Sequence, residues 1–497
     1  MPLEVWLWSL SVPLVLVLAN RQSTPKSGPN PSSKLFLGDV VAFGVGVALL
    51  SLLLGLTGRW ISSVAIAYFL IVLLWAGNRL KVQILEEALV FSDIFLAGHA
   101  IKYPRLYFFY APFWIWPLLL CLSIALLGGI WLEPVFLDSL KVRLCWVLMP
   151  IALFALGATV ARCPSRKIKT FLGHYPLTFL TQSDVALYSP LGAALLHCFW
   201  HGQYRQSIRE KSKIALKRSG EEVLLNKAHS PRHLVLIQAE SFCRLDQLLH
   251  RSCVTPSIDV LMNTGQSGQL LLDWRGAYTM RSEFAVLTGK APRSLQTYGF
   301  DPYQLASQVP LDSLARDLKS RGYHTVAWHP NDGRFFDRNH VFPHLGFDAF
   351  KDIEAFDNVK KLGRYVSDEG LLEKAVAYLR QCEEPTFLFI VTMEAHGPWL
   401  EDRFEGAEHL SETERYETHL KSLDRGVSLL KKAIEEGLPC DVALYGDHLP
   451  GLKILQNEKD HVPANTPWFI WGLSIKEGHQ TIRPELLREQ LLKRVDE

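Results

Sequence analysis

Apolar positions are distributed unevenly along this chain of 497 residues. The first third contains five apolar stretches that are long enough, or nearly so, to cross a hydrocarbon core of about 30 Å. Tryptophans fall towards the ends of these stretches, as is typical of indoles at a membrane interface. The first stretch follows no basic segment, which favours a retained span over a signal peptide. The pattern predicts an α-helical membrane domain of about five transmembrane helices within residues 1–165, at 4–20, 36–57, 60–78, 111–132 and 143–161.

Two other segments of the first half mix apolar and charged positions. Residues 86–110 combine Phe, Ile and Leu with Glu, Asp, His and Lys, which predicts an amphipathic segment at the membrane interface. Residues 166–230 are predicted to form interfacial and linker helices. Their basic run, 205–218, either contacts anionic head groups or is a solvated helix face. Lysines and arginines occur on both sides of any five-span arrangement, so they leave its orientation open.

After residue 230, short apolar runs alternate with amphipathic helical stretches. Strands buried on both faces and separated by helices indicate an α/β domain with a mainly parallel sheet. Residues 231–497 are enough for one core of this kind. The second predicted helix opens with Ser411 and Glu414 in the spacing of a capping box. The predicted strands are 233–238, 325–328, 387–392, 441–445 and 468–471, and the predicted helices are 311–321 and 412–436.

Three of these strands are followed within a few residues by side chains that can bind a metal ion. Glu240 follows the first strand, His396 follows the third, and Asp447 and His448 follow the fourth. In sheets of this class, ligands bind at the carboxyl ends of the strands. We therefore expect these side chains, although far apart in sequence, to meet at one edge of the sheet.

The residue types predict a metal-activated nucleophile. Glu240 and Asp447 are candidate anionic oxygen ligands and His448 a neutral nitrogen ligand. The simpler alternatives are a carboxylate at a helix N-terminus for Glu240 and an ordinary turn for Asp447 and His448. Thr279 is the candidate nucleophile, because a divalent ion shared with these groups can deprotonate its hydroxyl. Ser282 is the rival nucleophile, and an N-cap is the alternative role for either hydroxyl.

Two further residues are candidates for the substrate site. His396, followed by Gly397 and Pro398, suits binding of a phosphate oxygen or donation of a proton to a leaving alkoxide. Arg338 offers a bidentate grip on phosphate. The alternatives are a structural loop histidine and a surface salt bridge. His329 and His461 are weaker candidates, since a structural role accounts for both.

Composition excludes some classes of function. A net charge of +2 without a basic, aromatic-rich stripe argues against a nucleic-acid partner. None of the eight cysteines forms a CxxC pair, which argues against a structural zinc knuckle. Cys243 and Cys253 are close enough in sequence for a bridge in an exported domain, whereas buried free thiols are also common.

The order of the polar segments resembles that of a known family. The segments are Glu240-Ser241-Phe242, Thr279-x-x-Ser282-Glu283-Phe284, Gly322-Tyr323 leading to His329 and Phe335–Asn339, His396-Gly397-Pro398, and Gly446-Asp447-His448. Together with five preceding spans, these segments resemble the lipoteichoic acid synthase-like phosphoglycerol transferases of the alkaline phosphatase/sulfatase superfamily. The resemblance is most specific from about residue 230 to residue 475.

The resemblance implies an alkaline phosphatase-like catalytic domain over 231–497, on the extracytoplasmic side of the cytoplasmic (inner) membrane. It implies a phosphothreonine-type intermediate on Thr279, with Arg338 and His396 at the substrate. Phe336 stands where the family has a Trp, so a hydrogen bond to a glycerol hydroxyl is missing. The implied cofactor is an Mn²⁺-type ion, with Zn²⁺ or Mg²⁺ as alternatives, held by Glu240, Thr279, Asp447 and His448.

The expected reaction moves a phosphoglycerol headgroup from a phospholipid, phosphatidylglycerol, to a hydroxyl of an envelope glycan or glycolipid. The alternatives are phosphoethanolamine transfer, hydrolysis by a lipid phosphodiesterase of the same superfamily, and a non-catalytic membrane receptor. Sulfatase activity is disfavoured, because it needs Cys or Ser in a C/S-x-P-x-R context. The nearest match, Cys163-Pro164-Ser165-Arg166, has the wrong spacing.

Overall fold

The apolar stretches of the first third form helices in the computed structural model, which describes residues 3–24, 35–90, 93, 115–163, 165–223, 232–458, 462–473, 475 and 477–496. These helices are α1 (Leu3–Gln22), α2 (Leu35–Thr57), α3 (Trp60–Leu85), α6 (Ile115–Leu132) and α7 (Leu140–Arg162).

The number of candidate membrane spans differs from the prediction. Within the described residues, three segments have the length and hydropathy of a span: Leu35–Thr57, Trp60–Val82 and Leu140–Arg162. In the part of the chain that the structure describes, the number of candidate spans is therefore three and differs from the predicted number of about five. α1 is one of the helices outside this set, and its last turn carries the polar residues Asn20, Arg21 and Gln22. The fold class, apolar helices followed by an α/β domain, is confirmed.

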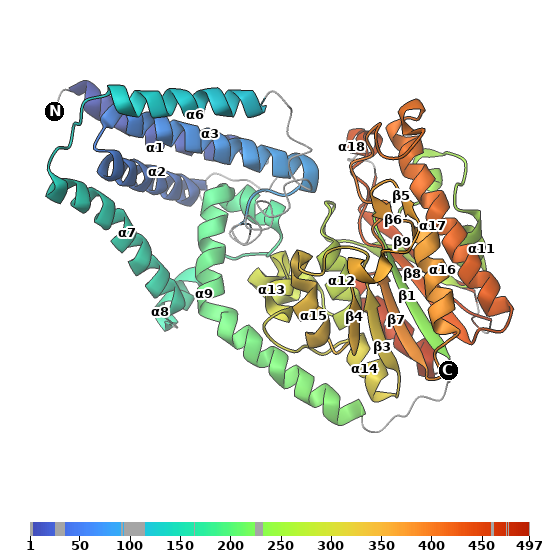
Figure 1. Ribbon diagram of the computed structural model, residues 1–497. Coiled ribbons are helices and arrows are strands. Elements are labelled where there is room, and N and C mark those ends of the chain that lie inside the picture. Colours follow the sequence, from blue (N-terminus) through green and yellow to red (C-terminus); the bar gives the residue numbers. More distant parts are fainter. Residues whose placement is uncertain are drawn as a thin grey trace. The chain divides into compact units, whose positions relative to one another are not determined.

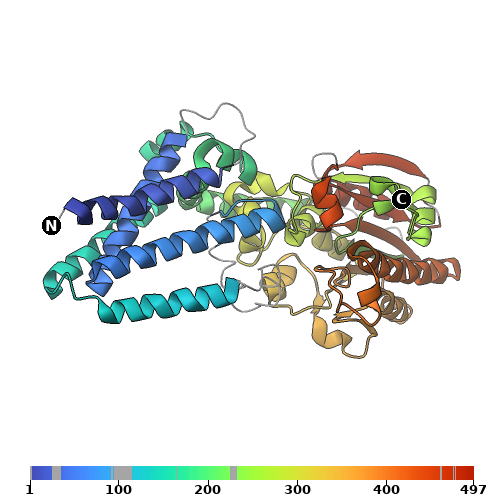
Figure 2. The ribbon, with the colours of Figure 1, turned by 90° about the horizontal axis from the view of Figure 1, so that it is seen from above.

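The chain divides into two units, Met1–Gln206 and Ser207–Glu497. In the first unit, α1 packs against α2 and α3, α2 also contacts α7, and α6 lies beside α3 (Figures 1 and 2). Gly46 of α2 lies so close to Pro13 of α1 that a Cβ atom would come within 2.6 Å of its Cα. Large apolar side chains, such as Phe154 at 80% exposure, point outward. Lipid suits such faces, and these helices anchor the protein in a membrane.

The first unit continues with α8 (Arg166–Gly173) and the long helix α9 (Thr181–Val223), which runs on into the second unit. Ser189 interrupts α9 with a φ of 61° just before Pro190. Asn20 satisfies this kink, because its Oδ1 atom accepts from the backbone N–H of Leu191 at 3.0 Å and its Nδ2 donates to Ser189 Oγ at 2.7 Å. The basic run predicted as a linker helix lies within α9. Most of the predicted interfacial segment 86–110 lies outside the described residues.

The second unit is built on an eight-stranded sheet with the order β10-β2-β9-β8-β1-β7-β3-β4. The run β8-β1-β7-β3-β4 is parallel throughout, as predicted. β9 is antiparallel to both neighbours, which a buried apolar run cannot reveal. The strands are β1 (His233–Ala239), β2 (Gln266–Leu271), β3 (His324–Trp328), β4 (Ala349–Lys351), β7 (Thr386–Val391), β8 (Cys440–Gly446), β9 (Asn465–Trp471) and β10 (Gly478–Ile482), with a separate hairpin of β5 (Lys361–Leu362) and β6 (Tyr365–Val366).

Helices cover both faces of this sheet. α16 and α17 pack against each other on one side, while α12, α14 and α15 lie on the other (Figure 1). The capping box predicted for α17 is present, with both hydrogen bonds between Ser411 and Glu414. The helices are α10 (Leu245–Leu249), α11 (Pro256–Thr264), α12 (Thr279–Thr288), α13 (Tyr303–Ala306), α14 (Leu314–Ser320), α15 (Arg338–His344), α16 (Asp368–Leu379), α17 (Glu412–Glu435), α18 (Lys453–Asn457) and α19 (Pro484–Asp496), with short 3₁₀ turns at Pro292–Phe300, Phe335–Asp337, Ile353–Phe356 and Ala407–His409.

The core lies between the sheet and α11, α16 and α17. It joins inward-facing strand residues such as Ile237, Leu388 and Val442 to apolar faces of those helices. Cys243 is buried and Cys253 exposed, and both are free thiols, so the two are not bridged.

Candidate active site

The register of β1 and β8 places two acidic residues side by side. Ala239 pairs with Gly446 at the carboxyl ends of these parallel strands. The next residues, Glu240 and Asp447, therefore lie side by side at the carboxyl-terminal edge of the sheet. β7 and β3, the next strands along, end at the same edge and lead to His396 and His329. The expected meeting of strand ends is confirmed.

The turn after β1 is locked to the end of β8. Ser241 has a φ of 55°, a conformation that non-glycine residues rarely adopt and that clusters at functional sites. Its backbone N–H donates to Asp447 Oδ1 at 2.8 Å, and its carbonyl accepts from the Tyr416 hydroxyl at 2.7 Å. A Cβ atom on Gly446 would lie 2.1 Å from the Phe242 carbonyl oxygen. Only glycine allows the two strand ends to approach this closely.

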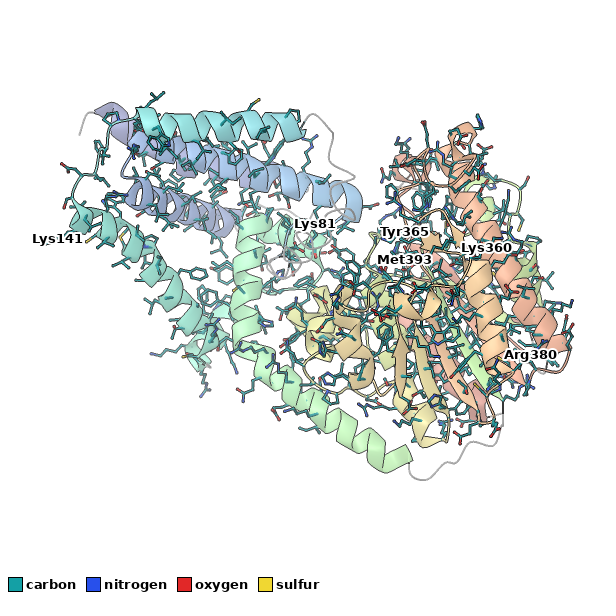
Figure 3. All side chains as sticks on the ribbon, in the orientation of Figure 1. Lys81, Lys141, Lys360, Tyr365, Arg380 and Met393 are labelled. Atoms are coloured by element: carbon teal, nitrogen blue, oxygen red, sulfur yellow. The ribbon has the colours of Figure 1, made fainter. Side chains whose placement is uncertain are left out.

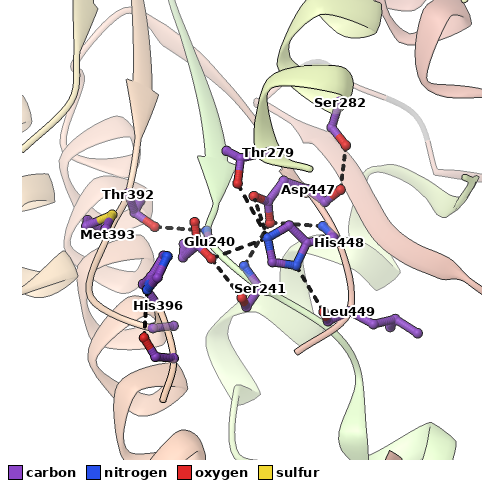
Figure 4. Close-up of polar contacts among 12 residues, drawn as sticks. Glu240, Ser241, Thr279, Ser282, Thr392, Met393, His396, Asp447, His448 and Leu449 are labelled. Atoms are coloured by element: carbon purple, nitrogen blue, oxygen red, sulfur yellow. Dashed lines mark hydrogen bonds and ion pairs between the residues drawn. The ribbon is translucent and has the colours of Figure 1, made fainter. Parts of the chain in front are cut away.

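Glu240, Asp447 and His448 bring one ligand atom each to within 4.8 Å of one another, and all three are buried. His448 Nδ1 contacts the Leu449 carbonyl oxygen at 2.9 Å. Its Nε2 faces Glu240 Oε1 at 3.4 Å and Asp447 Oδ2 at 3.3 Å (Figure 4). The backbone contact at Nδ1 orients the ring so that Nε2 is directed into the cluster.

Thr279 is the first residue of α12, and its Oγ1 lies 3.4 Å from His448 Nε2 (Figure 4). Its side chain is thus within reach of the cluster. Ser282, the rival nucleophile, is fully buried and donates its hydroxyl to the Asp447 carbonyl at 2.5 Å. The geometry favours Thr279 over Ser282, because only Thr279 faces the ligand atoms.

The electrostatics of the cluster fit a bound cation. Burial, and then the negative charge of Glu240, raise the pKa of Asp447. The pKa of His448 is raised despite its burial, because both carboxylates favour its protonated form. Asp447 Oδ2 is buried, and among the residues that the structure describes none forms a hydrogen bond with it, although His448 Nε2 lies 3.3 Å away. The two carboxylates, the imidazole nitrogen of His448 and the hydroxyl of Thr279 together form a suitable set of ligands for a divalent metal ion.

His396 lies half-buried in the loop after β7. Its Nδ1 contacts the Gly397 carbonyl at 2.7 Å, which in the neutral ring assigns the proton to Nδ1 and leaves Nε2 as an acceptor. Burial lowers the pKa of His396, and the nearby Glu240 carboxylate opposes this effect. The lowered pKa favours the neutral ring, whose Nε2 is then available to accept a proton.

Arg338, the candidate for binding phosphate, is buried and forms an ion pair, whereas the alternative considered for it was a salt bridge at the surface. It is 1% exposed and forms an ion pair with Glu283, with 3.0 Å between Nη2 and Oε2. The guanidinium carbon also lies 5.3 Å from the centre of the Phe336 ring. Within the described residues, the structure records no hydrogen bond from Nη1 of Arg338. One NH₂ group therefore remains to contact a substrate, while Glu283 holds the rest.

A second layer of polar residues, to which the sequence analysis assigned no role, supports His396. Arg403 donates to the carbonyls of Glu394 and His396 at 2.6 and 2.7 Å. The Glu394 carboxylate, fully buried, accepts from Ser422 and contacts His419 Nδ1 at 2.9 Å. Glu283 lies inside one of the motifs quoted above and Glu394 lies two residues before another, and only that proximity could have pointed to them. His461 lies outside the described residues.

The sequence of the chain is similar to those of known proteins of cell-envelope biosynthesis. The chain is 29% identical over 416 residues to the capsular polysaccharide biosynthesis protein RkpI of Rhizobium meliloti, covering 80% of this chain and 74% of that protein. It is 25% identical over 251 residues to a lipoteichoic acid synthase of Staphylococcus saprophyticus, covering 44% of this chain and 36% of that protein.

Among solved structures, the lipooligosaccharide phosphoethanolamine transferase A of Neisseria meningitidis superposes with a TM-score of 0.53 and 13% identity, over 99% of this chain and 95% of that one. This likeness extends through the helical unit as well as the α/β unit. The resemblance to lipoteichoic acid synthase-like proteins is confirmed. Because the profile of the Sulfatase family matches residues 232–486, about half of the chain and the whole of the sheet with its site, this protein belongs to the sulfatase family.

Proposed function

We propose that the protein is a membrane-anchored, metal-dependent phosphotransferase that moves a phosphoglycerol headgroup from phosphatidylglycerol to a hydroxyl of an envelope glycan or glycolipid. The observation that carries this proposal is the convergence of Thr279 with Glu240, Asp447 and His448. A hydroxyl at the N-terminus of a helix, facing a cation site, suits attack on a phosphate.

The first half-reaction transfers the headgroup to the enzyme. Thr279 Oγ1 attacks the phosphorus of the donor, the Oγ1–P bond forms, and the bond from phosphorus to the diacylglycerol oxygen breaks. His396 takes the hydroxyl proton at Nε2 and delivers it to the departing oxygen, so diacylglycerol leaves as an alcohol. Thr279 then carries the phosphoglycerol group as a phosphothreonine-type intermediate.

The second half-reaction reverses these roles. The acceptor hydroxyl attacks phosphorus, the acceptor O–P bond forms, and the Oγ1–P bond breaks. The acceptor proton returns to Thr279 through His396, which restores the enzyme. Arg338, through its remaining NH₂ group, and Phe336 beside it are assigned to binding the substrate phosphate and headgroup.

Glu240, Thr279, Asp447 and His448 are assigned as the residues that hold the ion, with Mn²⁺ proposed and Zn²⁺ or Mg²⁺ as alternatives. When bound there, a divalent cation supplies the charge that lowers the pKa of a hydroxyl and offsets the charge of the phosphate. The burial of all four residues strengthens this effect, because little water competes.

Residues 231–497 are proposed as the catalytic domain, on the extracytoplasmic side of the inner membrane, with residues 1–165 as the membrane domain and 166–230 as linker helices. A phospholipid donor explains why such a domain is joined to apolar helices, since the headgroup lies at the membrane surface. The glycan acceptor is supported by the relative named for capsular polysaccharide biosynthesis.

The test is intact-protein mass spectrometry after incubation with phosphatidylglycerol. We expect the wild type to gain the mass of one phosphoglycerol group. Thr279→Ala should gain none and should lose roughly three orders of magnitude or more in donor turnover. Ser282→Ala is the matched control and should keep the adduct. Full donor turnover by Thr279→Ala would refute the assignment of the nucleophile.

The same experiment separates related reactions. A phosphoethanolamine adduct from phosphatidylethanolamine, with none from phosphatidylglycerol, would identify the ethanolamine variant. Release of free glycerophosphate in the presence of acceptor would identify a hydrolase. Absence of both bound metal and any adduct would identify a non-catalytic protein.

A further inference from the structure

The first unit contains a cavity of about 950 Å³ bordered by α1, α3, α7 and α9. This volume lies at the upper end of the range for small-molecule sites. Most of its wall is apolar, with Leu16, Leu74, Phe154 and Leu191 among the lining residues. A hydrocarbon chain fits such a wall, because no polar group has to be desolvated there.

The polar residues of the cavity are mostly occupied by internal contacts. The Asp93 carboxylate accepts from Lys81 Nζ at 2.7 Å and from the Val90 N–H at 2.6 Å. Lys81, labelled in Figure 3, is only 9% exposed, and its positive charge offsets the negative charge of Asp93. The Asn78 Oδ1 atom accepts from the Leu89 N–H at 2.7 Å. These groups therefore contribute no net charge to the cavity.

Two arginines remain. Arg162 ends α7, Arg205 lies in α9, and both line the cavity. The structure records no hydrogen bond or ion pair for either guanidinium in the part of the chain it describes. The two helices meet closely here, since a Cβ atom on Gly202 would lie 2.3 Å from the Ala161 carbonyl oxygen. Gln203 reinforces the junction by donating to that same carbonyl at 2.7 Å. Arg162 directly follows Ala161, and Arg205 lies two residues after Gln203, so both positively charged residues come from the helix segments that form this junction.

We propose that this cavity binds one phospholipid with an anionic headgroup, with acyl chain along the apolar wall and phosphate at Arg162 and Arg205. Arginine binds phosphate oxygens in a bidentate fashion. A free phosphate would leave the apolar wall empty, and a neutral lipid would leave both charges without a counterion. The site lies within the helical unit alone, so it does not depend on the proposed reaction of the other unit.

Native mass spectrometry of the purified full chain tests the charge requirement. The protein is offered phosphatidylglycerol and phosphatidylcholine with identical acyl chains, in EDTA so that no headgroup is transferred. The wild type should retain phosphatidylglycerol preferentially. R162Q and R205Q should each reduce this preference roughly fivefold. The double variant should reduce it by the product of the two single reductions. The matched control R166Q/K167Q removes two exposed charges of α8 outside the cavity and should keep the preference.

A second pair of variants tests the apolar part. Ala158→Phe places a ring in the cavity and should reduce retention of both lipids at least fivefold, whereas Ala152→Phe, on an exposed position of α7 outside the lining, should not. Size-exclusion profiles confirm that each variant is folded. Unchanged selectivity in R162Q/R205Q, or unchanged retention in Ala158→Phe, would overturn the proposal.

Discussion

At the scale of single residues, the chemistry of the site depends on a few side chains. Some of them could be identified from the sequence and others could not. Glu240, Asp447 and His448 could be identified because each directly follows a buried strand. The partner of Arg338 could not, because nothing in the spacing of Glu283 and Arg338 indicates that they form a buried pair. The sequence therefore indicated Arg338 as a phosphate-binding candidate without indicating that Glu283 holds part of its guanidinium.

Removal of one carboxylate of the cluster tests the cation site. Glu240→Gln keeps the size of the side chain but removes a negative charge from a fully buried group of ligands. We expect bound metal to fall by on the order of a hundredfold in affinity, with activity lost in parallel. Metal analysis after dialysis is the measurement, and Glu373→Gln, an exposed position on α16, is the control. Metal content equal to the wild type would contradict the assignment.

The Arg338–Glu283 pair predicts strongly non-additive stability. Glu283→Gln or Arg338→Met alone leaves one charge buried without its partner, which should cost about 3–5 kcal/mol of unfolding free energy. The double variant should be closer to the wild type than the sum of the single changes. Thermal or denaturant unfolding of all four proteins measures the coupling. If the unfolding free-energy changes of the two single variants simply add up in the double variant, the two side chains do not stabilise each other.

At the scale of elements, local signals and long-range packing differ in how well they could be predicted. The capping box of α17 depends on residues three apart, so the sequence alone identified it correctly. β2 and β10 contain Gln, Gly, His and Thr and were not predicted, because their pairing arises only when the sheet assembles. The turn after β1 likewise needs β8 beside it.

Gly446 tests how closely β1 and β8 must approach. A methyl group at this position would meet the Phe242 carbonyl oxygen at 2.1 Å, so the backbone has to shift. We expect Gly446→Ala to cost about 1–3 kcal/mol of stability and to reduce activity, because Glu240 and Asp447 move apart. Gly451→Ala, whose nearest neighbour would lie 3.9 Å away, is the matched control. Equal unfolding midpoints for the two variants would exclude this close contact.

At the scale of the whole molecule, the two units follow different physical rules. The helical unit exposes large apolar side chains, whereas the α/β unit buries them together with several histidines. His329 is the extreme case, since burial and the nearby positive charge of Arg338 lower its pKa to about 3. Its Nδ1 contacts the Val391 carbonyl at 3.1 Å, which suits the neutral ring.

This histidine predicts a pH dependence of stability. Because its folded pKa lies below the ordinary value of 6.5, the unfolded chain binds the extra proton as pH falls below about 6.5. Stability from this group is therefore present above that pH and declines by up to about 1.4 kcal/mol per pH unit below it. His329→Gln should remove that slope between pH 6.5 and 5, as measured by denaturant unfolding of the full chain in detergent. His409→Gln, at an exposed side chain, should keep it.

The sequence by itself determined the apolar helices, the alternation of strands and helices, and the side chains that follow the strands, because these depend on neighbours within a few residues. It also identified Thr279, which lies beside His448 in the structure. Only the tertiary structure decided that β9 runs antiparallel, that Glu283 holds Arg338, and that Arg162 and Arg205 line the same apolar cavity. Each of these depends on contacts between segments distant in the chain, whose distances are set by packing and not by local preference.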